Sequence, residues 1–339
     1  MGHPIQTTVR PALTVILVLA ITPTPGALDG APVVLETGRS VAALVGAAHP
    51  GAAAPLHPAG YGPWRVVIGM GAVWVANRAD RTVSQLDPAT NRVVGRPVAL
   101  PFDPWDLAVG AGAVWVSSNG AAGAMARIDP RRHVVVALVG GEPHVLGPFI
   151  AAGADAVWTA NGDERADGGT TVSRIDPATN RIVATFLAGE NFQGIAVAAG
   201  SVWAASHDVG TVTRIDPRSN RVVATVKLGF APHGLAARHG ALWVIDYHGS
   251  AVWPINVATN HVGTPVQLDF APFTGAVSTT GVWVTGPASS GRVVRVDPRN
   301  HRVAETLHVG GQPYAVAVGR GVLWVAVQDP DAVLRIVAH

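Results

Sequence analysis

The sequence predicts an all-β fold, a seven-bladed β-propeller built from four-stranded blades. Two observations predict it: seven tryptophans recur at intervals of 40 to 45 residues, and most are followed by a hairpin motif of similar composition. A repeat of about forty residues that offers four short strands is typical of a propeller blade. The alternative is an open β-solenoid, whose coils are usually shorter and need caps. The tryptophans are Trp74, Trp115, Trp158, Trp203, Trp243, Trp283 and Trp324.

The first half of each repeat contains a tryptophan in a short apolar phrase, such as Gly71-Ala72-Val73-Trp74-Val75. We expect this phrase to be the second strand of its blade, because another short apolar strand and a tight glycine turn precede it. Small residues flank the tryptophans in several repeats. We therefore expect the tryptophan column to pack between neighbouring blades rather than to bind a ligand.

The second half of the repeat reads as a hairpin around an Asp-Pro turn. The segment 176–183 closely repeats 87–94, and 216–223 is a variant of it. Asp and Pro suit the first two positions of a type I turn, and the later Asn tolerates a left-handed backbone. β-branched residues on both sides predict the third and fourth strands. We expect the Asp-Pro aspartates to form turns rather than to catalyse: Asp87, Asp129, Asp176, Asp216 and Asp297.

The two ends of the chain predict how the ring closes. The last repeat stops after its third strand, at 333–337, and the segment at about 37–46 reads like the missing fourth strand. We expect this N-terminal strand to complete the last blade, which leaves only short, protected edges. The predicted organisation is a propeller over 61–339, preceded by a linker over 28–60 that includes the closing strand.

Residues 1–27 are predicted to be a secretory signal peptide. Arg10 precedes an apolar run over 12–21 that is short for a membrane span, and prolines follow it. A retained N-terminal anchor is the alternative. We expect an extracytoplasmic protein (secreted, periplasmic or in the cell envelope) with no transmembrane span in the mature chain. The chain has no cysteine, which excludes disulfides, thiolate metal sites and a lipid-anchored cysteine.

Composition and charge limit the classes of partner. Hydrophobic residues make up 48% of the chain and charged residues only 14%, which agrees with many buried strands. The formal net charge is only +2, and the arginines recur at equivalent places in the repeats. A repeated arginine favours a structural partner, an Asp or a carbonyl, over a nucleic-acid stripe, and no basic cluster interleaved with aromatics is present. We expect a monomer, and the sequence disfavours nucleic acid as a partner without excluding it.

The binding surface is predicted on the face where the repeats differ. At the start of the first strand, an aromatic residue often follows a proline and would line the central funnel. These residues predict either an aromatic mouth for an apolar or planar ligand, or a plug that packs the narrow end of the ring. The candidate ligand-binding residues are Trp64, Trp105, Phe149, Phe273 and Tyr314, with Asn77 and Asn161 from the loops after the second strands.

A second candidate site combines His and Asp side chains of the fourth and fifth repeats. His207, His233, Asp246 and His248 are the candidate metal ligands, and the last three are also the candidate catalytic residues. Imidazole and carboxylate can hold a divalent cation such as Mg²⁺ or act as an acid–base pair. Scattered surface histidines are the alternative. In the third repeat, the longer loop at 161–170 is either a lid or a solvated loop.

The phrases Gly-Ala-Val-Trp-Val-Ala-Asn (71–77) and Asp-Pro-Ala-Thr-Asn-Arg-Ile-Val-Ala-Thr (176–185) resemble YVTN-type propeller repeats. Over about 37–339 the chain resembles the exported, seven-bladed YncE-like proteins, in the wider group that includes virginiamycin B lyase. The YncE-like resemblance implies a binding protein of the bacterial envelope, whose partner is a small molecule, a peptide or an envelope protein. The lyase resemblance implies Mg-assisted elimination that opens a cyclic depsipeptide, with His and Glu on the funnel face.

The sequence departs from the lyase pattern at one position of every repeat. The lyase repeats commonly carry Glu three residues after Trp, and here only Asp246 could replace it. Calcium-dependent lactonase propellers, which need Glu, Asn and Asp, are matched only by Asn77, Asn161 and Asp246. We therefore expect a binding or interaction module, with a lyase or a metal-dependent hydrolase as the alternative. The residues at the Glu position are Asn77, Ser118, Asn161, Ser206, Asp246, Gly286 and Val327.

Overall fold

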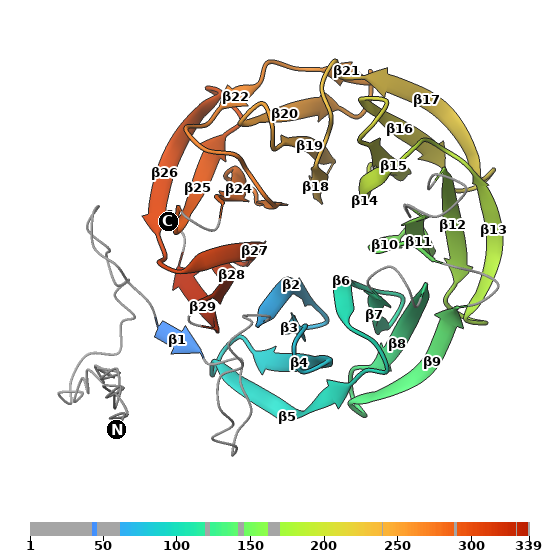
Figure 1. The fold of residues 1–339 in the computed structure, drawn as a ribbon, viewed down its shortest axis with the longest axis vertical. Helices are drawn as coiled ribbons and strands as arrows, with labels where there is room; N and C mark the ends of the chain where they lie inside the picture. Colours follow the sequence, from blue (N-terminus) through green and yellow to red (C-terminus); the bar gives the residue numbers. More distant parts are fainter. Residues whose placement is uncertain are drawn as a thin grey trace, which may run out of the picture. The chain divides into compact units, whose positions relative to one another are not determined.

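A computed structural model describes residues 43–45, 62–118, 123–141, 146–161, 170–238, 240–287, 290–329 and 331–337. These residues form only strands and turns, arranged as seven antiparallel sheets around a ring (Figure 1). The prediction of an all-β, seven-bladed propeller is confirmed. No helix in this part of the chain is long and apolar enough to cross a membrane. The expected signal peptide, the linker apart from 43–45, and residues 162–169 of the longer loop lie outside the described residues.

The first four blades each contain four strands that pair in sequence order, from the channel outwards. Blade 1 comprises β2 (Pro63–Gly69), β3 (Ala72–Asn77), β4 (Thr82–Asp87) and β5 (Arg92–Ala99). Blade 2 comprises β6 (Pro104–Gly110), β7 (Ala113–Ser118), β8 (Ala124–Asp129) and β9 (Val134–Gly140). Blade 3 comprises β10 (Phe149–Gly153), β11 (Ala156–Asn161), β12 (Thr171–Asp176) and β13 (Arg181–Leu187). Blade 4 comprises β14 (Phe192–Ala198), β15 (Ser201–Ser206), β16 (Thr211–Asp216) and β17 (Arg221–Lys227).

The remaining three blades follow the same plan with local changes. Blade 5 comprises β18 (Gly234–Arg238), β19 (Ala241–Asp246), β20 (Ala251–Asn256), β21 (His261–Val262) and β22 (Val266–Gln267). Blade 6 comprises β23 (Gly275–Val277), β24 (Val282–Thr285), β25 (Arg292–Asp297) and β26 (Arg302–His308). Blade 7 comprises β27 (Gln312–Gly319), β28 (Val322–Gln328), β29 (Ala332–Val337) and, paired with β29, β1 (Ala43–Val45).

The outer strand of blade 5 is interrupted because β20 contains a proline. The carbonyl of Pro254 accepts the N–H of Gly263 at 2.8 Å, but Pro254 has no N–H to donate back. The outer strand therefore splits into β21 and β22, which pair with opposite ends of β20. In blade 7, Leu44 of β1 lies opposite Leu334 of β29. Closure of the ring by the whole segment 37–46 stays a prediction.

The Asp-Pro turns form as the sequence predicts. Oδ1 of Asp87 accepts the backbone N–H of Ala89 at 2.8 Å, and Asn91 adopts a left-handed φ of 59°. The hydrogen bond from Ala89 is the main reason that the pKa of Asp87 lies below its ordinary value. The equivalent aspartates accept the same backbone bond, so these carboxylates shape turns: Asp129, Asp176, Asp216 and Asp297.

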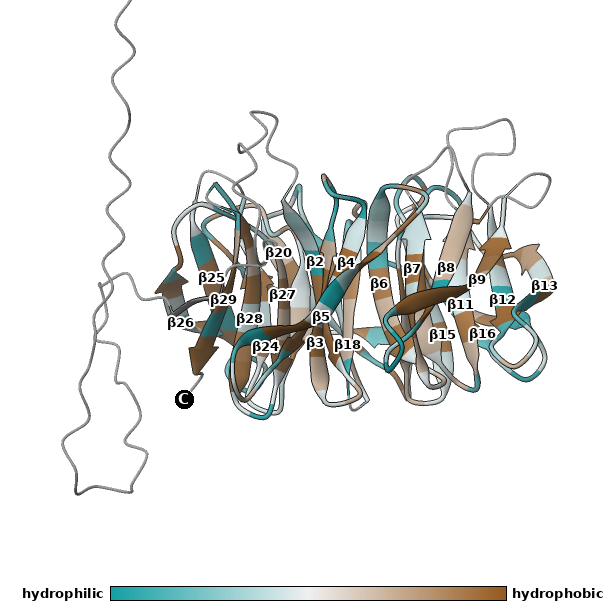
Figure 2. Cartoon of the chain, turned by 90° about the horizontal axis from the view of Figure 1, so that it is seen from below, coloured by the Kyte–Doolittle hydropathy of each residue, from teal (hydrophilic) through white to brown (hydrophobic). Residues whose placement is uncertain are grey.

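The tryptophan column packs between blades. Trp74 is 1% exposed, and the same hydrophobic cluster contains Val114 and Ile128 of blade 2. Its indole N–H donates to the carbonyl of Gly69 at 3.3 Å, so its polar atom is satisfied within its own blade. Figure 2 shows hydrophobic stretches through the strands and hydrophilic turns at the rim. The core is therefore the set of interfaces between successive blades.

Arginines on the third strands connect successive blades. The Arg127 guanidinium of blade 2 lies 5.4 Å from the Trp115 ring centroid and donates to Asn180 Oδ1 of blade 3 at 2.8 Å. It also donates to the Pro177 carbonyl at 2.7 Å. Arg174 and Arg214 repeat the bond to the next blade's turn asparagine. These arginines are structural, as the sequence predicts, although their side-chain partner is Asn rather than Asp.

Candidate functional site

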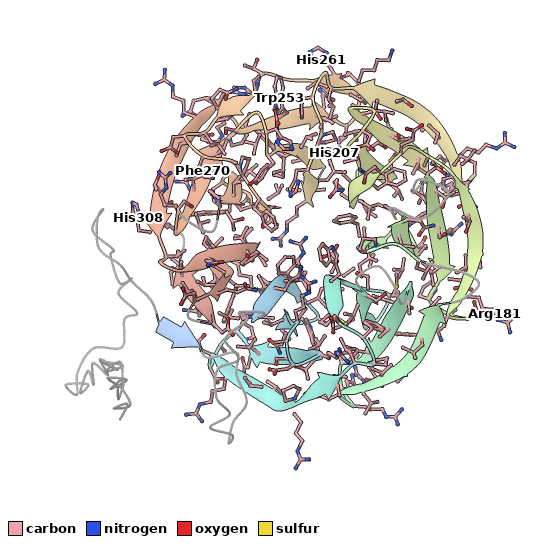
Figure 3. The ribbon with its side chains drawn as sticks, in the orientation of Figure 1. Arg181, His207, Trp253, His261, Phe270 and His308 are labelled. Atoms are coloured by element: carbon pink, nitrogen blue, oxygen red, sulfur yellow. The ribbon has the colours of Figure 1, made fainter. Side chains whose placement is uncertain are left out.

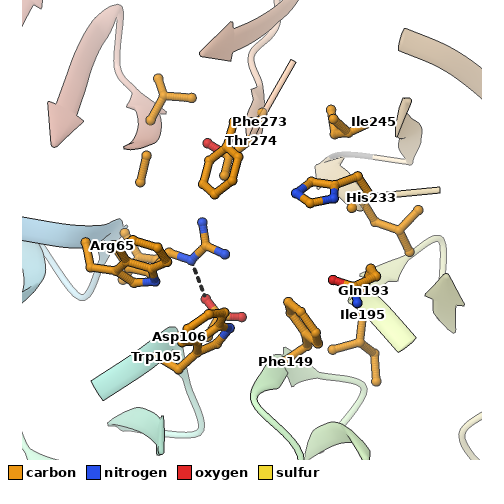
Figure 4. A pocket seen from close by; sticks show the side chains of 18 of the residues that line it. Arg65, Trp105, Asp106, Phe149, Gln193, Ile195, His233, Ile245, Phe273 and Thr274 are labelled. Atoms are coloured by element: carbon orange, nitrogen blue, oxygen red, sulfur yellow. Dashed lines mark ion pairs between the residues drawn. The ribbon is translucent and has the colours of Figure 1, made fainter. Parts of the chain in front are cut away.

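A cavity of about 520 Å³ occupies the centre of the ring and is lined by the innermost strand regions of all seven blades (Figure 4). Most of its wall is aromatic or aliphatic, with a few polar side chains. Small-molecule sites in proteins usually have this size and composition. The cavity is therefore the candidate site, and it lies where the sequence predicts an aromatic funnel.

Several inner strands begin with a bulge, and at Trp64 it accompanies a side chain that lines the cavity, whereas Tyr314 contacts Trp64 without lining it. The pairing of β2 with β3 slips between Pro63 and Arg65, so Trp64 is left out of the ladder. β27 slips in the same way at Tyr314, between Pro313 and Ala315. A bulge re-aims the extra side chain, which explains why an aromatic residue follows a strand-initial proline in these repeats. Similar slips occur at the start of β6 and β14.

The candidate aromatic residues come together across several blades. The Trp64 ring centroid lies 5.2 Å from that of Trp105 and 4.8 Å from that of Tyr314. Phe273 lies 5.6 Å from Tyr314, and His233 lies 5.5 Å from Phe273. Phe149 lines the cavity from blade 3. These tilted and edge-on contacts, together with Phe149, make up the aromatic wall that is called the aromatic funnel below.

Two arginines of blade 1 add positive charge to this wall. The Arg78 guanidinium lies 4.9 Å from the ring centroids of both Trp64 and Trp105. Arg65 extends from β2 into the cavity, and its Nε lies 3.5 Å from Oδ1 of Asp106 on β6. The stacked Arg78 fixes the two indoles relative to each other.

Asp106 is held in place from blades 2 and 3. Its Oδ1 accepts the N–H of Leu107 at 2.9 Å, and its Oδ2 accepts the N–H of Ile150 at 3.2 Å. Burial raises the pKa of this carboxyl above its ordinary value, although Arg65 and both hydrogen bonds oppose the shift. The side chain is 20% exposed, so it forms part of the cavity wall rather than of the solvated surface.

His233 provides a neutral imidazole at the cavity wall. Burial lowers its pKa from 6.5 to about 4, and the positive charge of Arg65 adds to this shift. Three further rings are linked to His233 by successive contacts between ring centroids. Tyr247 lies 5.1 Å from His233, His248 lies 5.3 Å from Tyr247, and His207 lies 6.1 Å from His248. Figure 3 shows His207 inside the ring and His261 and His308 on its outer edge.

Comparison with known proteins identifies neighbours of the fold but no sequence family. No protein-family model matches the sequence, and no protein of curated function matches it. Among solved structures, a Kuenenia stuttgartiensis hydrazine synthase superimposes with a TM-score of 0.71 at 15% identity, covering 84% of this chain and 98% of that chain. A streptogramin B lyase superimposes with a TM-score of 0.69 at 17% identity, covering 83% and 94% respectively.

A catalytically inactive variant of virginiamycin B lyase from Staphylococcus aureus, solved with quinupristin, has a TM-score of 0.67 at 17% identity. The match covers 81% of this chain and 94% of that chain. This chain is a propeller with the fold of virginiamycin B lyase. At these identities the likeness concerns the fold alone, and any chemistry depends on this chain's own side chains.

Asp246 is engaged within blade 5. Its Oδ1 accepts the N–H of Gly249 at 2.7 Å, and its Oδ2 accepts the indole N–H of Trp253 at 3.2 Å. The residue is 3% exposed. Oδ1 therefore serves the turn between β19 and β20, and Oδ2 binds a side chain of β20, so both oxygens are engaged within blade 5.

The described residues include no cluster of three or more His, Asp or Glu side chains that could hold a metal ion. Of the four candidate ligands, His207 instead pairs with Asp208, with Nδ1 at 2.9 Å from Oδ1. The pKa of Asp208 is lowered chiefly by this hydrogen bond. We therefore derive no chemical step through a divalent cation, and Mg²⁺ stays a prediction of the sequence.

The two candidate asparagines bind within their own blades. Asn77 donates to Thr82 Oγ1 at 3.1 Å and to Ser84 Oγ at 2.8 Å. Asn161 makes the equivalent bonds to Thr171 and Ser173. These amides tie the second strand to the third, so we leave them out of the proposed binding site.

Sequence reasoning missed four polar residues of the cavity, Arg65, Asp106, Gln193 and Thr274. Arg65 and Asp106 directly follow the predicted aromatic residues, and Gln193 takes the aromatic position in blade 4, between Phe192 and Gly194. Charged residues at the start of an otherwise apolar inner strand were the available signal. The bulge that turns them into the cavity has no signature apart from the strand-initial proline.

Proposed function

We propose that this propeller is an exported binding module whose central cavity takes a compact, partly aromatic small molecule. The observation that carries the proposal is the aromatic funnel, in which rings from five blades line a cavity of about 520 Å³. Apolar rings placed around open space favour a planar guest, because stacking adds to the burial of its surface. A plug would leave no such space, so the cavity favours binding over the plug.

The funnel is suited to binding because its parts are fixed in advance. Trp64 and Trp105 are stacked under Arg78, and the Asp106 carboxylate is anchored by two backbone N–H groups. Binding to a preorganised wall costs less conformational entropy than binding to mobile side chains. The inner strands hold these residues on a rigid scaffold, and no chemical step is needed to explain the arrangement.

The experiment that tests this proposal is a ligand-observed NMR screen of small aromatic compounds against the full chain. Phe273→Leu removes a ring from the funnel, and Phe230→Leu is the matched control, because Phe230 stacks on Trp253 at 4.9 Å outside the cavity lining. We expect hits whose signals are lost with Phe273→Leu and kept with Phe230→Leu. Hits that survive Phe273→Leu but not Phe230→Leu would refute the cavity as the site.

Export is tested separately. We infer an extracytoplasmic location from the predicted signal peptide over 1–27, and cell fractionation followed by mass spectrometry of the N-terminus would test it. A mature chain that begins after about residue 27 in the extracytoplasmic fraction would support the inference. A full-length chain in the cytoplasmic fraction would contradict it.

A second candidate function is elimination chemistry with His233 as the base. The favouring observation is a neutral imidazole at the wall of a cavity whose fold neighbours include a streptogramin B lyase. His233 would take the proton next to a carbonyl group while the ester C–O bond breaks and its oxygen leaves as a carboxylate. A pKa of about 4 makes His233 a weak base, which favours the binding function.

Mass spectrometry distinguishes these functions with a streptogramin B as the probe. Elimination opens the ring without a change of mass, whereas hydrolysis adds one water. A new chromatographic species of unchanged mass that disappears with His233→Ala would establish the lyase function. An unchanged substrate after long incubation would leave binding as the function of the cavity.

A further inference from the structure

We propose that the ligand of the aromatic funnel carries a carboxylate beside its aromatic part, and that the Arg65 guanidinium binds this carboxylate. The inference rests on the proposed binding function and names its ligand class, the aromatic carboxylates. Three observations support it: the position of the Arg65 guanidinium, the hydrogen bonds that Asp106 already accepts, and the positive charge around the cavity.

Arg65 has donors that the described part of the protein does not use. Its Nε lies 3.5 Å from Asp106 without a hydrogen-bond partner, and no described residue accepts a hydrogen bond from its two terminal amino groups. Figure 4 shows the end of the guanidinium in the open centre of the cavity, directed away from Asp106. A guanidinium presents five N–H donors in a planar fork that matches a carboxylate. The terminal pair of nitrogens is therefore available to a guest.

Asp106 compensates this charge only in part. Its two oxygens already accept the N–H groups of Leu107 and Ile150, and it meets Arg65 at a distance longer than a hydrogen bond. The Arg65 side chain is 16% exposed, so it is largely shielded from bulk solvent. Charge-assisted hydrogen bonds are strong in such surroundings, and a second carboxylate on the free edge of the guanidinium would complete its set of partners.

The charge around the cavity disfavours a cationic guest. Arg65 and Arg78 both lie at the funnel, and Arg78 is already stacked with Trp64 and Trp105, the rings best suited to an ammonium group. The pKa of His233 is depressed partly by the charge of Arg65, which indicates a positive potential at the wall opposite blade 1. An anion would therefore be attracted where a cation is repelled.

The aromatic part of the guest is defined by the rings around Arg65. Phe273 and Trp105 line the cavity on either side of it, and Phe149 lies further along the wall (Figure 4). A carboxylate one or two bonds from an aromatic ring would place the ring against these faces while its oxygens meet the guanidinium. Arylacetates have this geometry.

The experiment compares acids with their neutral amides by calorimetric titration of the full chain. Indole-3-acetate and indole-3-acetamide are the first pair, and phenylacetate and phenylacetamide are the second. We expect each acid to bind the native protein at least about tenfold more tightly than its amide, because the amide cannot accept two charge-assisted bonds. Arg65→Gln should remove this preference, and Arg65→Lys should keep part of it.

Arg181→Gln is the matched control, because Arg181 is exposed on the outer edge of the ring (Figure 3). It should leave both affinities unchanged.

Equal binding of acid and amide to the native protein, or an acid preference that survives Arg65→Gln, would overturn the carboxylate inference while the binding function stands. Failure of all four compounds to bind would overturn the inference as well; hits for other aromatic compounds in the NMR screen would then still support the binding function. Arg65→Lys keeps the test decisive if Arg65→Gln does not fold.

Discussion

Nε of Arg65 lies 3.5 Å from Oδ1 of Asp106, so an ion pair joins blades 1 and 2 at the wall of the central cavity. Oδ2 of the same carboxylate accepts the N–H of Ile150 on blade 3 at 3.2 Å. One side chain thus connects three consecutive blades at the place where the guest is proposed to bind. Stability of the ring and geometry of the site therefore depend on the same group.

Replacement of Asp106 should destabilise the ring. Asp106→Ala leaves Arg65 without its anion and the Ile150 N–H without its acceptor, at a cost of about 1–3 kcal/mol. Asp106→Asn keeps an acceptor oxygen and should cost less. The measurement is the free energy of unfolding in urea, and equal stability of Asp106→Ala and the native protein would contradict the role of this carboxylate.

Asp246 is predicted to matter for folding and not for binding. Asp246→Ala removes the acceptor of the Gly249 and Trp253 N–H groups, which should cost about 1–3 kcal/mol. The affinity for an aromatic ligand should be unchanged, because Asp246 does not line the cavity. Urea unfolding and ligand titration on the same preparation check both parts. Loss of binding without loss of stability would contradict this prediction and show that Asp246 takes part in ligand binding.

The bridge between blades 2 and 3 should be worth about 1–2 kcal/mol. Arg127→Met removes the hydrogen bond to Asn180 and the stacking on Trp115. Asn180→Gly removes the acceptor but tolerates the left-handed φ of 57°. In a double-mutant cycle these two changes should be coupled. Arg181→Met is the surface control, with an expected change within about 0.5 kcal/mol. Additive effects of the first two changes would argue against the bridge.

His233 should make stability depend on pH. Its pKa is about 4 in the folded chain against 6.5 for an unperturbed histidine, so between these values the unfolded chain holds a proton that the folded chain lacks. Stability should therefore decrease as the pH falls from 6.5 towards 4, with no further loss from this group below that. Between pH 7 and 4.5, the free energy of unfolding of His233→Gln should fall by about 1–2 kcal/mol less than that of the native protein. This figure allows for solvent screening of a half-buried ring. Equal losses in the two proteins would show that the imidazole is not the cause.

The fold could be predicted because its determinants are local and repeated. Asp87 and Asn91 form their turn with near neighbours, and Trp74 needs only small residues beside it, so each copy carries the same signal. The aromatic side of the site was predictable for the same reason, since a proline precedes Trp64 at the start of its strand. Such local features can be recognised in a single sequence without any knowledge of distant contacts.

The polar side of the site was not predictable in this way. Asp246 stands two residues from His248 in the chain, but its carboxylate turns towards Trp253, which the spacing alone does not reveal. Arg65 meets Asp106 only because two strand-initial bulges turn both side chains into one cavity. Contacts between blades depend on ring geometry, so the residue types suggested chemistry but not the partners.

The central claim, that the aromatic funnel is the binding site, is tested most directly by ¹⁹F NMR of protein labelled with 5-fluorotryptophan. The chain has ten tryptophans, of which Trp64 and Trp105 line the cavity, and seven form the buried column between blades. Trp64→Phe and Trp105→Phe assign the two cavity signals. Addition of indole-3-acetate, or of a hit from the NMR screen, should shift these two signals and leave the column and Trp253 unchanged. A shift confined to Trp253, or no shift at a ligand concentration that saturates binding, would contradict the claim.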